Sequence, residues 1–394
     1  MPNTPLQNKC FDALWDKARI VSGGIRVSDS AAANSGAGVT AKEAAGRDRR
    51  GDEALLPMMF SIPLGFTMFL RQNPKSDYAL EYEDGIFFVT KGGALLWEGI
   101  TFPKRPKFYD GETSDGKKFR DIGMILTDKC IEVWYSNECA FKERDEECMF
   151  CDINKRGPGD TFLKQSSHIA ELTKAAFDEG IADRIDFTGG VIAERREIEY
   201  YTDAIEAIQD ALGCTDINSS ACIAAPRDFG NIGRLKEAGF SNVTLNMEIW
   251  DENIFRTVCP GKERTVGHAR WIEAEKYAAR VFGFGHVRCN FVTGIEPKFK
   301  TLEGIEYLAS VGVYANPNSF GPRAGTPFEG VRPPTLEWYY DLSFKAAEIQ
   351  MRCGFTYELV RSCHPETTQI IFDVYRIREE LLPVFGHQEK FELR

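Results

Sequence analysis

Several features that would assign this chain to a particular class are missing from its 394 residues. No run of about 18 consecutive apolar residues occurs, so no membrane span is expected. The first residues lack a basic region followed by an apolar core, so no secretory signal is predicted. Basic residues are outnumbered, because 48 Lys and Arg stand against 59 Asp and Glu and give a net charge of -11. An acidic chain repels phosphate backbones, which argues against a nucleic-acid partner.

Cysteine is too sparse for a disulfide-stapled scaffold, since the chain has 11 cysteines, an odd number. Together with the missing secretory signal, this predicts reduced cysteines, some of which can bind metal, and a cytoplasmic location. No pair among the 5 histidines has the spacing of zinc ligands. Hydrophobic residues at 43% and charged residues at 27% are typical of a globular protein with an ample core.

An N-terminal extension is predicted over residues 1-120. Within it, residues 5–21 are expected to form a helix. Residues 23–52 are rich in Gly, Ala, Ser and charge with little apolar periodicity, which indicates a mobile or loop-rich segment. Over residues 77–103 apolar and polar residues alternate and two glycine-containing turns occur. This pattern predicts a small antiparallel β-meander.

From about residue 160 onward, stretches with helical periodicity alternate with short strands. Repeated helix–strand units predict parallel strands joined by crossover helices. Six or more units in succession favour an α/β fold of the TIM-barrel-like (β/α) type, full or partial, with six to eight units. An open doubly wound sheet is the alternative. With the β-rich stretch 122–135 as its beginning, the barrel is assigned to residues 121-360 and a helical C-terminal cap to residues 361-394.

The sharpest local feature is a cluster of cysteines in the segment NECAFKERDEECMFCDINKR. Cys139, Cys148 and Cys151 follow a C-x8-C-x2-C spacing, which lets one loop hold one metal centre. The loop follows the first expected barrel strand, at the mouth where such barrels carry catalytic groups. A structural zinc site needs a fourth ligand that is not local. A [4Fe–4S] cluster on three thiolates leaves one iron open. Three unrelated cysteines, or half a zinc knuckle, are the plain alternative.

With these cysteines the sequence resembles the radical S-adenosylmethionine (SAM) superfamily, over about residues 122–335. Members usually carry C-x3-C-x2-C with an aromatic residue before the last cysteine. Phe150 takes that aromatic position here, whereas the first gap is eight residues instead of three. The resemblance implies that Cys139, Cys148 and Cys151 bind a [4Fe–4S] cluster whose open iron binds SAM.

The same resemblance implies a backbone site for the methionyl amino group of SAM. The second barrel strand ends in Thr188, Gly189 and Gly190, where the family has a Gly-Gly-Glu stretch. Val191 replaces the Glu, so only the backbone role carries over. An ordinary turn between a strand and a helix is the alternative.

Further SAM contacts are implied by similarity to biotin synthase and its relatives. Asn246 and Glu248 lie two residues apart on the fourth strand and so share a face. In those relatives such a pair binds the ribose hydroxyls of SAM. Arg270, which opens the next long helix, takes the place of an arginine that binds the SAM carboxylate, with Arg264 as the fallback; a solvated helix residue is the alternative. The segment SFGPRAGTPFEG also resembles biotin synthase, the [FeFe]-hydrogenase radical SAM maturase and methylornithine synthase.

Two more cysteines bear on a second cluster. Cys222 and Cys289 fall where biotin synthase places two ligands of an auxiliary [2Fe–2S] cluster. Asp186 stands at the matching second-strand position, and Arg323 is the candidate for the arginine ligand. Because four thiolates cannot be assembled from these residues, a single cluster is predicted, and buried structural thiols are the alternative.

The resemblance implies a radical SAM enzyme. Such an enzyme reductively cleaves SAM to methionine and a 5′-deoxyadenosyl radical, which abstracts hydrogen from a small organic substrate. It implies two cofactors, a [4Fe–4S] cluster and SAM, and an electron donor such as flavodoxin or ferredoxin. Sulfur insertion with an auxiliary cluster is the runner-up. A zinc-dependent hydrolase or a non-catalytic metal-binding barrel is the interpretation from a different class.

Overall fold

The computed structural model describes residues 5–36, 56–126, 129–136, 138–153, 163–192, 194–363 and 368–379. Most of the predicted loop-rich segment, and the predicted cap beyond residue 379, lie outside these residues. No helix of the described part is both long and apolar enough to cross a lipid bilayer.

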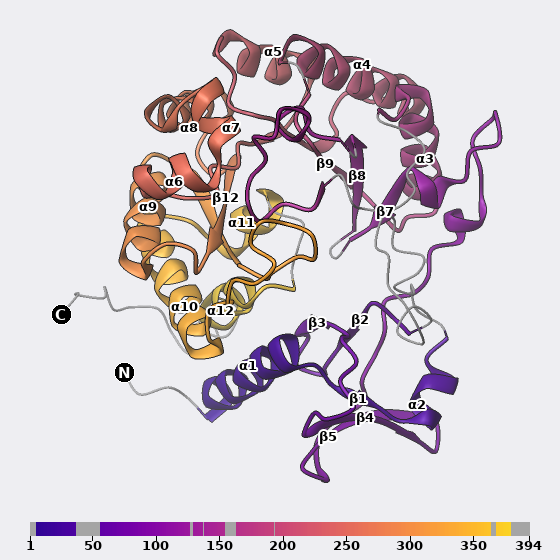
Figure 1. Ribbon diagram of the computed structural model, residues 1–394. Coiled ribbons are helices and arrows are strands. Elements are labelled where there is room, and N and C mark those ends of the chain that lie inside the picture. The colour runs from indigo at the N-terminus through magenta and orange to yellow at the C-terminus, as the bar shows by residue number, and fades with distance from the viewer. Residues whose placement is uncertain are drawn as a thin grey trace.

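The centre of the molecule is a seven-stranded sheet in the order β13-β12-β11-β10-β9-β8-β7. Strands β8 to β13 pair in parallel, and β7 adds to β8 in antiparallel fashion. The strands are β7 (Gly123–Ile125), β8 (Cys130–Ser136), β9 (Arg184–Gly189), β10 (Asn218–Cys222), β11 (Asn242–Thr244), β12 (Val287–Thr293) and β13 (Val313–Ser319). Figure 1 shows them arranged around the middle of a ring of helices. The predicted TIM-barrel-like α/β fold is confirmed.

The outer layer consists of five crossover helices, each of which returns one strand to the next, and of α10, which follows the last strand. They are α3 (Ser166–Asp178), α4 (Glu194–Leu212), α5 (Gly230–Ala238), α8 (His268–Phe282), α9 (Lys298–Ser310) and α10 (Leu336–Arg352). Each buries an apolar stripe against the strands: on α8 the buried residues include Trp271, Ala274 and Ala278, at helical spacing. Two short helices, α6 (Glu252–Val258) and α7 (Pro260–Thr265), are inserted after β11. They become important at the site.

The N-terminal extension has its own sheet, in the order β1-β4-β5-β6. Its strands are β1 (Arg26–Val27), β4 (Tyr78–Glu83), β5 (Ile86–Lys91) and β6 (Ala94–Glu98), and β2 (Met59–Ser61) pairs with β3 (Thr67–Phe69). The β4–β5–β6 meander is the one predicted. Asp84 and Gly85 between β4 and β5 both have positive φ, as do Gly92 and Gly93 between β5 and β6. Two positive φ values are what a tight two-residue hairpin turn requires.

Two helices flank the extension. The predicted N-terminal helix forms as α1 (Pro5–Gly23), whereas a short α2 (Asp29–Asn34) interrupts the segment predicted to be loop-rich. The hydroxyl of Ser28 accepts a hydrogen bond from the backbone of Ala31 at 3.2 Å, and this N-cap starts α2 despite the weak apolar pattern.

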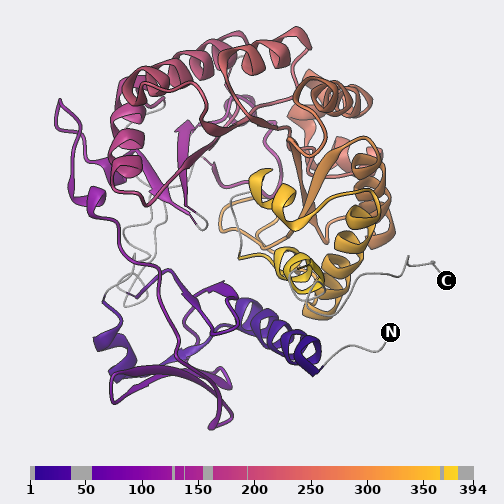
Figure 2. The ribbon, with the colours of Figure 1, turned by 180° about the vertical axis from the view of Figure 1, so that it is seen from behind.

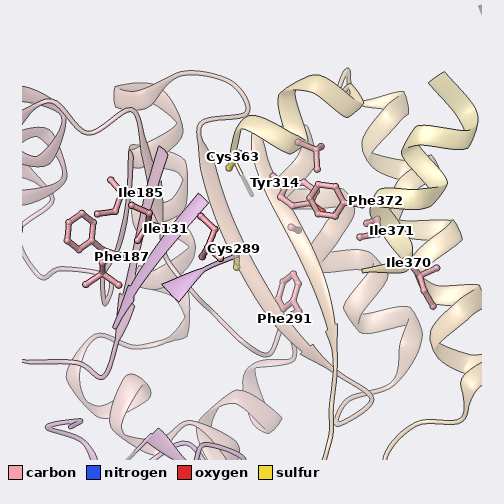
Figure 3. Packing of buried hydrophobic residues seen from close by; sticks show 14 of the residues in the cluster. Ile131, Ile185, Phe187, Cys289, Phe291, Tyr314, Cys363, Ile370, Ile371 and Phe372 are labelled. Carbon is pink, nitrogen blue, oxygen red and sulfur yellow. The ribbon is translucent and has the colours of Figure 1, made fainter. Parts of the chain in front are cut away.

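The C-terminal helices tie the extension to the barrel. The ammonium of Lys17 on α1 lies 2.6 Å from Asp373 on α12 (Ile370–Glu379), and both side chains are buried. On its other side α12 packs on the barrel: Phe372 lies 6.5 Å, between ring centroids, from Tyr314 of β13 (Figure 3). The buried residues of the extension and the barrel form one continuous hydrophobic cluster. The domain boundaries remain predictions.

The two ends of the barrel differ. Helix α11 (Tyr357–Cys363) lies across the N-terminal end of the sheet, where the backbone carbonyl of Cys363 accepts a hydrogen bond from Arg288 at 3.3 Å. Figure 2 shows α11 over the middle of the ring from behind, whereas in Figure 1 the loop that follows β8 lies over the middle from the front. The C-terminal ends of the strands are thus left for the loop that carries Cys139, Cys148 and Cys151, which we call the cysteine loop.

Candidate functional site

A cavity lies at the C-terminal ends of β8 to β11. Of the residues predicted from the sequence, it brings together Cys139, Cys148, Phe150, Cys151, Gly189, Gly190, Asn246 and Glu248. The other residues that line it include Tyr135, Glu197, Cys222, Lys262 and Trp271. Residues far apart in the sequence therefore converge on one space.

The cysteine loop begins where β8 ends. The hydroxyl of Ser136, the last residue of β8, donates to the carbonyl of Glu138 at 2.9 Å and turns the chain. Cys139 comes before the short 3-10 helix η4 (Lys142–Arg144), and Asp145 after η4 has a φ of 55° that reverses the direction. The two remaining cysteines face the cavity from a tight turn, in which the Cys151 N–H donates to the Cys148 carbonyl at 2.9 Å.

Glycines let the loop approach its neighbours closely. A Cβ on Gly190 would lie 1.9 Å from the carbonyl oxygen of Glu138, and one on Gly261 would lie 2.6 Å from that of Glu146. Both contacts are far too short for a real side chain. The backbone role of Gly190 in ligand binding stays a prediction, and its position makes room for the cysteine loop.

The surroundings of the three thiols favour their protonated form. Burial raises the pKa of Cys139, and it raises that of Cys151 to about 12. A hydrogen bond with the buried Cys259, followed by burial itself, raises the pKa of Cys148 well above its ordinary value. A bound metal would have to displace these protons, because thiolates are the binding form.

The donor set fits a cluster better than a single ion. In the described ranges, no three His, Cys, Asp or Glu side chains are arranged to hold one metal ion. The thiolates of a cubane cluster each bind a different iron and therefore lie further apart than the ligands of one ion. Three soft sulfur donors around one cavity suit iron–sulfur ligation, and charged groups stand in the same cavity for a polar ligand.

Glu248 and Lys262 form an ion pair in the cavity. Their side chains are 13% and 8% exposed, and the Lys262 ammonium lies 2.9 Å from the carboxylate. The ammonium also donates to the backbone carbonyl of Asn246 and lies 4.8 Å from the ring centroid of Trp271. Burial, the largest single effect, lowers the pKa of Lys262, but the charge of Glu248, the charges of Cys148 and Cys259 and the hydrogen bond to Glu248 together outweigh burial, and the pKa ends above its ordinary value. Lys262 is therefore a cation held inside the site.

Glu248 has an unusual backbone. Its φ is 73°, and its N–H donates to the carbonyl of Asn290 at 3.0 Å, while its own carbonyl accepts from Val292 at 2.8 Å. The chain after β11 thus stays attached to β12 although the regular strand has ended. Such a non-glycine φ is uncommon, and it occurs here at a cavity wall.

Arg270 does not reach the cavity, contrary to the sequence prediction. Its guanidinium lies 4.2 Å from the ring centroid of Phe229 and 3.6 Å from Glu273, and its side chain is 43% exposed. The fallback, Arg264, pairs with Glu146 and is 55% exposed. On α8 the next residue, Trp271, is fully buried, so Arg270 points about one quarter turn away from the core. Thr188 also does not line the cavity.

Two lining residues had no specific sequence signal. The Tyr135 hydroxyl lies 2.7 Å from the carboxylate of Glu197 and 2.9 Å from the carbonyl of Gly190. Burial is the largest cause that raises the pKa of Tyr135, followed by the charge of Glu197. Glu197 comes from the first turns of α4 and so supplies a carboxylate near the position where Val191 replaced the expected one. Lys262 was missed in the same way, since a lysine in a short helix is unremarkable in sequence.

The four residues considered for a second cluster do not converge. Arg288 of β12 reaches Asp186 of β9 at 3.1 Å, past the two strands between them, so both point into the barrel. Cys289 follows Arg288 and therefore faces outward. Burial, and then the charge of Glu275 on α8, raise the pKa of Cys289. Cys222 lines the cavity, whereas Arg323 lies in an exposed stretch and does not.

Comparisons with known sequences give one curated relative. No model of a protein family matches the chain. The bacteriochlorophyllide c C-7(1)-hydroxylase of Chlorobaculum limnaeum is 25% identical over 261 residues, which cover 61% of this chain. The chain spans 65% of that relative's length.

Several solved structures are similar to part of this chain. The FeFe-hydrogenase maturase HydG from Carboxydothermus hydrogenoformans matches 60% of this chain and 57% of its own, with 16% identity and a TM-score of 0.45. Methylornithine synthase (PylB) matches 62% and 70%, with 16% identity and a TM-score of 0.42. A radical SAM methyltransferase from Sphaerobacter thermophilus matches 72% and 76%, with 14% identity and a TM-score of 0.45.

Proposed function

We propose that this chain is a radical SAM enzyme that reductively cleaves SAM at a [4Fe–4S] cluster and directs the resulting 5′-deoxyadenosyl radical at a small organic substrate. The observation that carries the proposal is the convergence of Cys139, Cys148 and Cys151 with Asn246 and Glu248 on one cavity. The cluster, when bound, supplies the electron that breaks the carbon–sulfur bond of SAM.

The protein's own part is to bind, orient and exclude water. The three cysteines would hold the cluster as thiolates, after loss of the protons that burial keeps on them. Phe150 lies between the last two cysteines and lines the cavity. The cavity is roofed by the cysteine loop and enclosed by the barrel strands, and this shields a reactive radical from solvent.

SAM would be bound by other groups that line the same cavity as the three cysteines. Glu248 and Asn246 are assigned to the ribose hydroxyls, and the backbone of Gly189 and Gly190 to the methionyl amino group. Lys262 takes over the role first assigned to Arg270, since it is the lysine that lines the cavity and a carboxylate of SAM needs a cation. In the ligand-free protein this cation is neutralised by Glu248.

Glu197 adds a second carboxylate to the cavity. Its position near Gly190 supports a role beside the amino group of SAM, where the family's Glu is absent from the sequence. Tyr135, 2.7 Å from Glu197, would keep that carboxylate in place.

For the reaction that follows SAM cleavage, we propose candidates by type of reaction. Hydrogen abstraction from a small molecule, with an acidic one-electron donor such as flavodoxin or ferredoxin, is the first candidate. Hydroxylation of a carbon–hydrogen bond is the second, favoured by the 25% identity with the hydroxylase. Sulfur insertion is less well supported, because Cys289 faces away from the cavity and Asp186 is paired with Arg288. A cytoplasmic location is proposed from the sequence alone.

Anaerobic reconstitution with iron and sulfide tests the proposal. We expect a brown protein with about four irons per chain, whose colour dithionite bleaches and which then converts SAM to 5′-deoxyadenosine. Cys139→Ala, Cys148→Ala and Cys151→Ala should each lose the iron and the reaction. Cys214→Ala removes an exposed cysteine outside the cavity and serves as the matched control. A colourless protein that takes up zinc through the same cysteines would contradict the proposal.

A further inference from the structure

A fourth cysteine reaches the cavity that the cysteine loop covers. Cys222 is the last residue of β10, beside the end of β9. All 11 cysteines lie in the described residues, and among them Cys222 alone lines this cavity besides the three of the loop. A thiol therefore stands inside the space where a carbon radical would form.

The Cys222 side chain is held in a defined position. The side-chain amide of Asn246 donates to the Cys222 sulfur at 3.4 Å. That amide is itself fixed, because its oxygen accepts from the backbone N–H of Asn290 at 3.1 Å and from the Asn290 side chain at 2.8 Å. Three neighbouring strands thus hold the sulfur in place at the cavity wall.

Cys222 keeps its hydrogen at neutral pH. Burial, only partly offset by the positive charge of Arg288, raises the pKa of Cys222 to about 12. The sulfur is nevertheless not sealed off, since the residue is only half-buried and faces the cavity. Its S–H hydrogen can therefore exchange with solvent. It lacks the companions of a cluster ligand, because Cys289 points outward and Asp186 is paired with Arg288.

We propose that Cys222 is a catalytic residue of this site, whose thiol donates a hydrogen atom to a carbon radical in the cavity. The inference rests on the proposed function. The S–H bond of a thiol is weaker than the C–H bond of a primary carbon, so the transfer runs downhill. The S–H bond breaks, a C–H bond forms on the former radical, and a thiyl radical remains on Cys222. One electron from the one-electron donor and one proton from solvent restore the thiol.

Cleavage of SAM in heavy water without any substrate tests this directly. The probe is SAM itself, with dithionite as reductant and no added thiol. Cys222 then carries deuterium, whereas O–D and N–D bonds are too strong for a carbon radical to break. We expect one deuterium in the 5′-deoxyadenosine made by the reconstituted wild-type protein, measured by mass spectrometry. Cys222→Ala and Cys222→Ser should lose this label and keep the iron content.

Cys289→Ala is the matched control. It removes a buried thiol from the outward face of β12, beside Glu275 of α8, and should leave the label unchanged. Persistence of the label in both Cys222 variants, or unlabelled 5′-deoxyadenosine from the wild type, would overturn the role of Cys222 alone. Loss of iron in both Cys222 variants would make it a cluster ligand and also overturn it. A wild-type protein that forms no 5′-deoxyadenosine would instead refute the proposed function on which the inference rests.

Discussion

The ion pair between Glu248 and Lys262 should dominate the local energetics of the cluster-free site. Glu248→Gln keeps the shape of the side chain but leaves the buried ammonium without its counter-ion. Removing one partner of a buried pair costs about 3–5 kcal/mol. Lys262 would retain the carbonyl of Asn246 and the ring of Trp271 at 4.8 Å. We therefore expect a loss at the lower end, about 3 kcal/mol.

Urea denaturation of the cluster-free protein measures this loss as a change in the free energy of unfolding at unchanged m-value. Lys262→Met should cost less, because the Glu248 carboxylate faces the cavity and can be hydrated there. The double variant Glu248→Gln/Lys262→Met should recover most of the loss, since replacing both members of a buried pair is often nearly neutral. The coupling energy should lie within about 0.5–3 kcal/mol.

Glu252→Gln provides the matched control. Glu252 pairs with Arg256 on one exposed helix turn, with side chains 63% and 54% exposed, and such pairs contribute only about 0.3–0.5 kcal/mol. If Glu248→Gln costs no more than this control, or if the two site variants are simply additive, the ion pair does not exist in solution. Lys262 would then no longer be a credible cation for the SAM carboxylate.

Two further predictions concern the loop and the C-terminal helix. Gly190→Ala should displace the cysteine loop and abolish iron binding, because the new Cβ would lie 1.9 Å from the Glu138 carbonyl; Gly233→Ala, with open space around it, should bind iron normally. Retained iron in Gly190→Ala would show that the loop can move aside. Burial raises the pKa of Asp373 to about 6 although Lys17 is adjacent, so the folded protein holds a proton that the unfolded chain releases. The free energy of unfolding, relative to Asp373→Asn, should therefore fall by up to about 3 kcal/mol as pH rises from about 4 to about 6; a difference that is constant or rises with pH would contradict this.

Local sequence patterns predicted most of the helices and strands correctly. Alternation of polar and apolar residues with turn glycines is a short-range signal, and the meander of the N-terminal extension forms where it predicts. The repeat of helix and strand after residue 160 predicts parallel strands, and five of them, β9 to β13, follow β8 in sequence order in the described part. The short helix α2 was missed because its N-cap, Ser28, is one hydroxyl in a stretch without apolar periodicity.

The cation of the site shows where sequence reasoning failed. Lys262 and Arg270 lie eight residues apart. Lys262 precedes the long helix α8, and Arg270 lies in the first turn of that helix. Similarity to biotin synthase and its relatives favours Arg270, but the choice depends on how α6 and α7 bring the chain back to the cavity. In this fold α7 presents Lys262 inward, and the buried face of α8 begins with Trp271 and excludes Arg270. The spacing of residues along the sequence does not show which side of each helix faces the cavity.

For Cys222 and Cys289, which lie on strands, the sequence likewise does not show which side chain faces the cavity. Both stand on strands where an auxiliary cluster could be expected, and nothing in their flanking residues separates them. Successive side chains of a strand point to opposite faces, so a shift of one residue in the strand boundary would exchange inward and outward positions. The ion pair between Arg288 and Asp186 settles the parity, since it can form only inside the barrel and leaves Cys289 on the helix side. The Cys222 thiol therefore faces the cavity, whereas the Cys289 thiol faces the helix layer. This difference makes the two cysteines a matched pair for experiment.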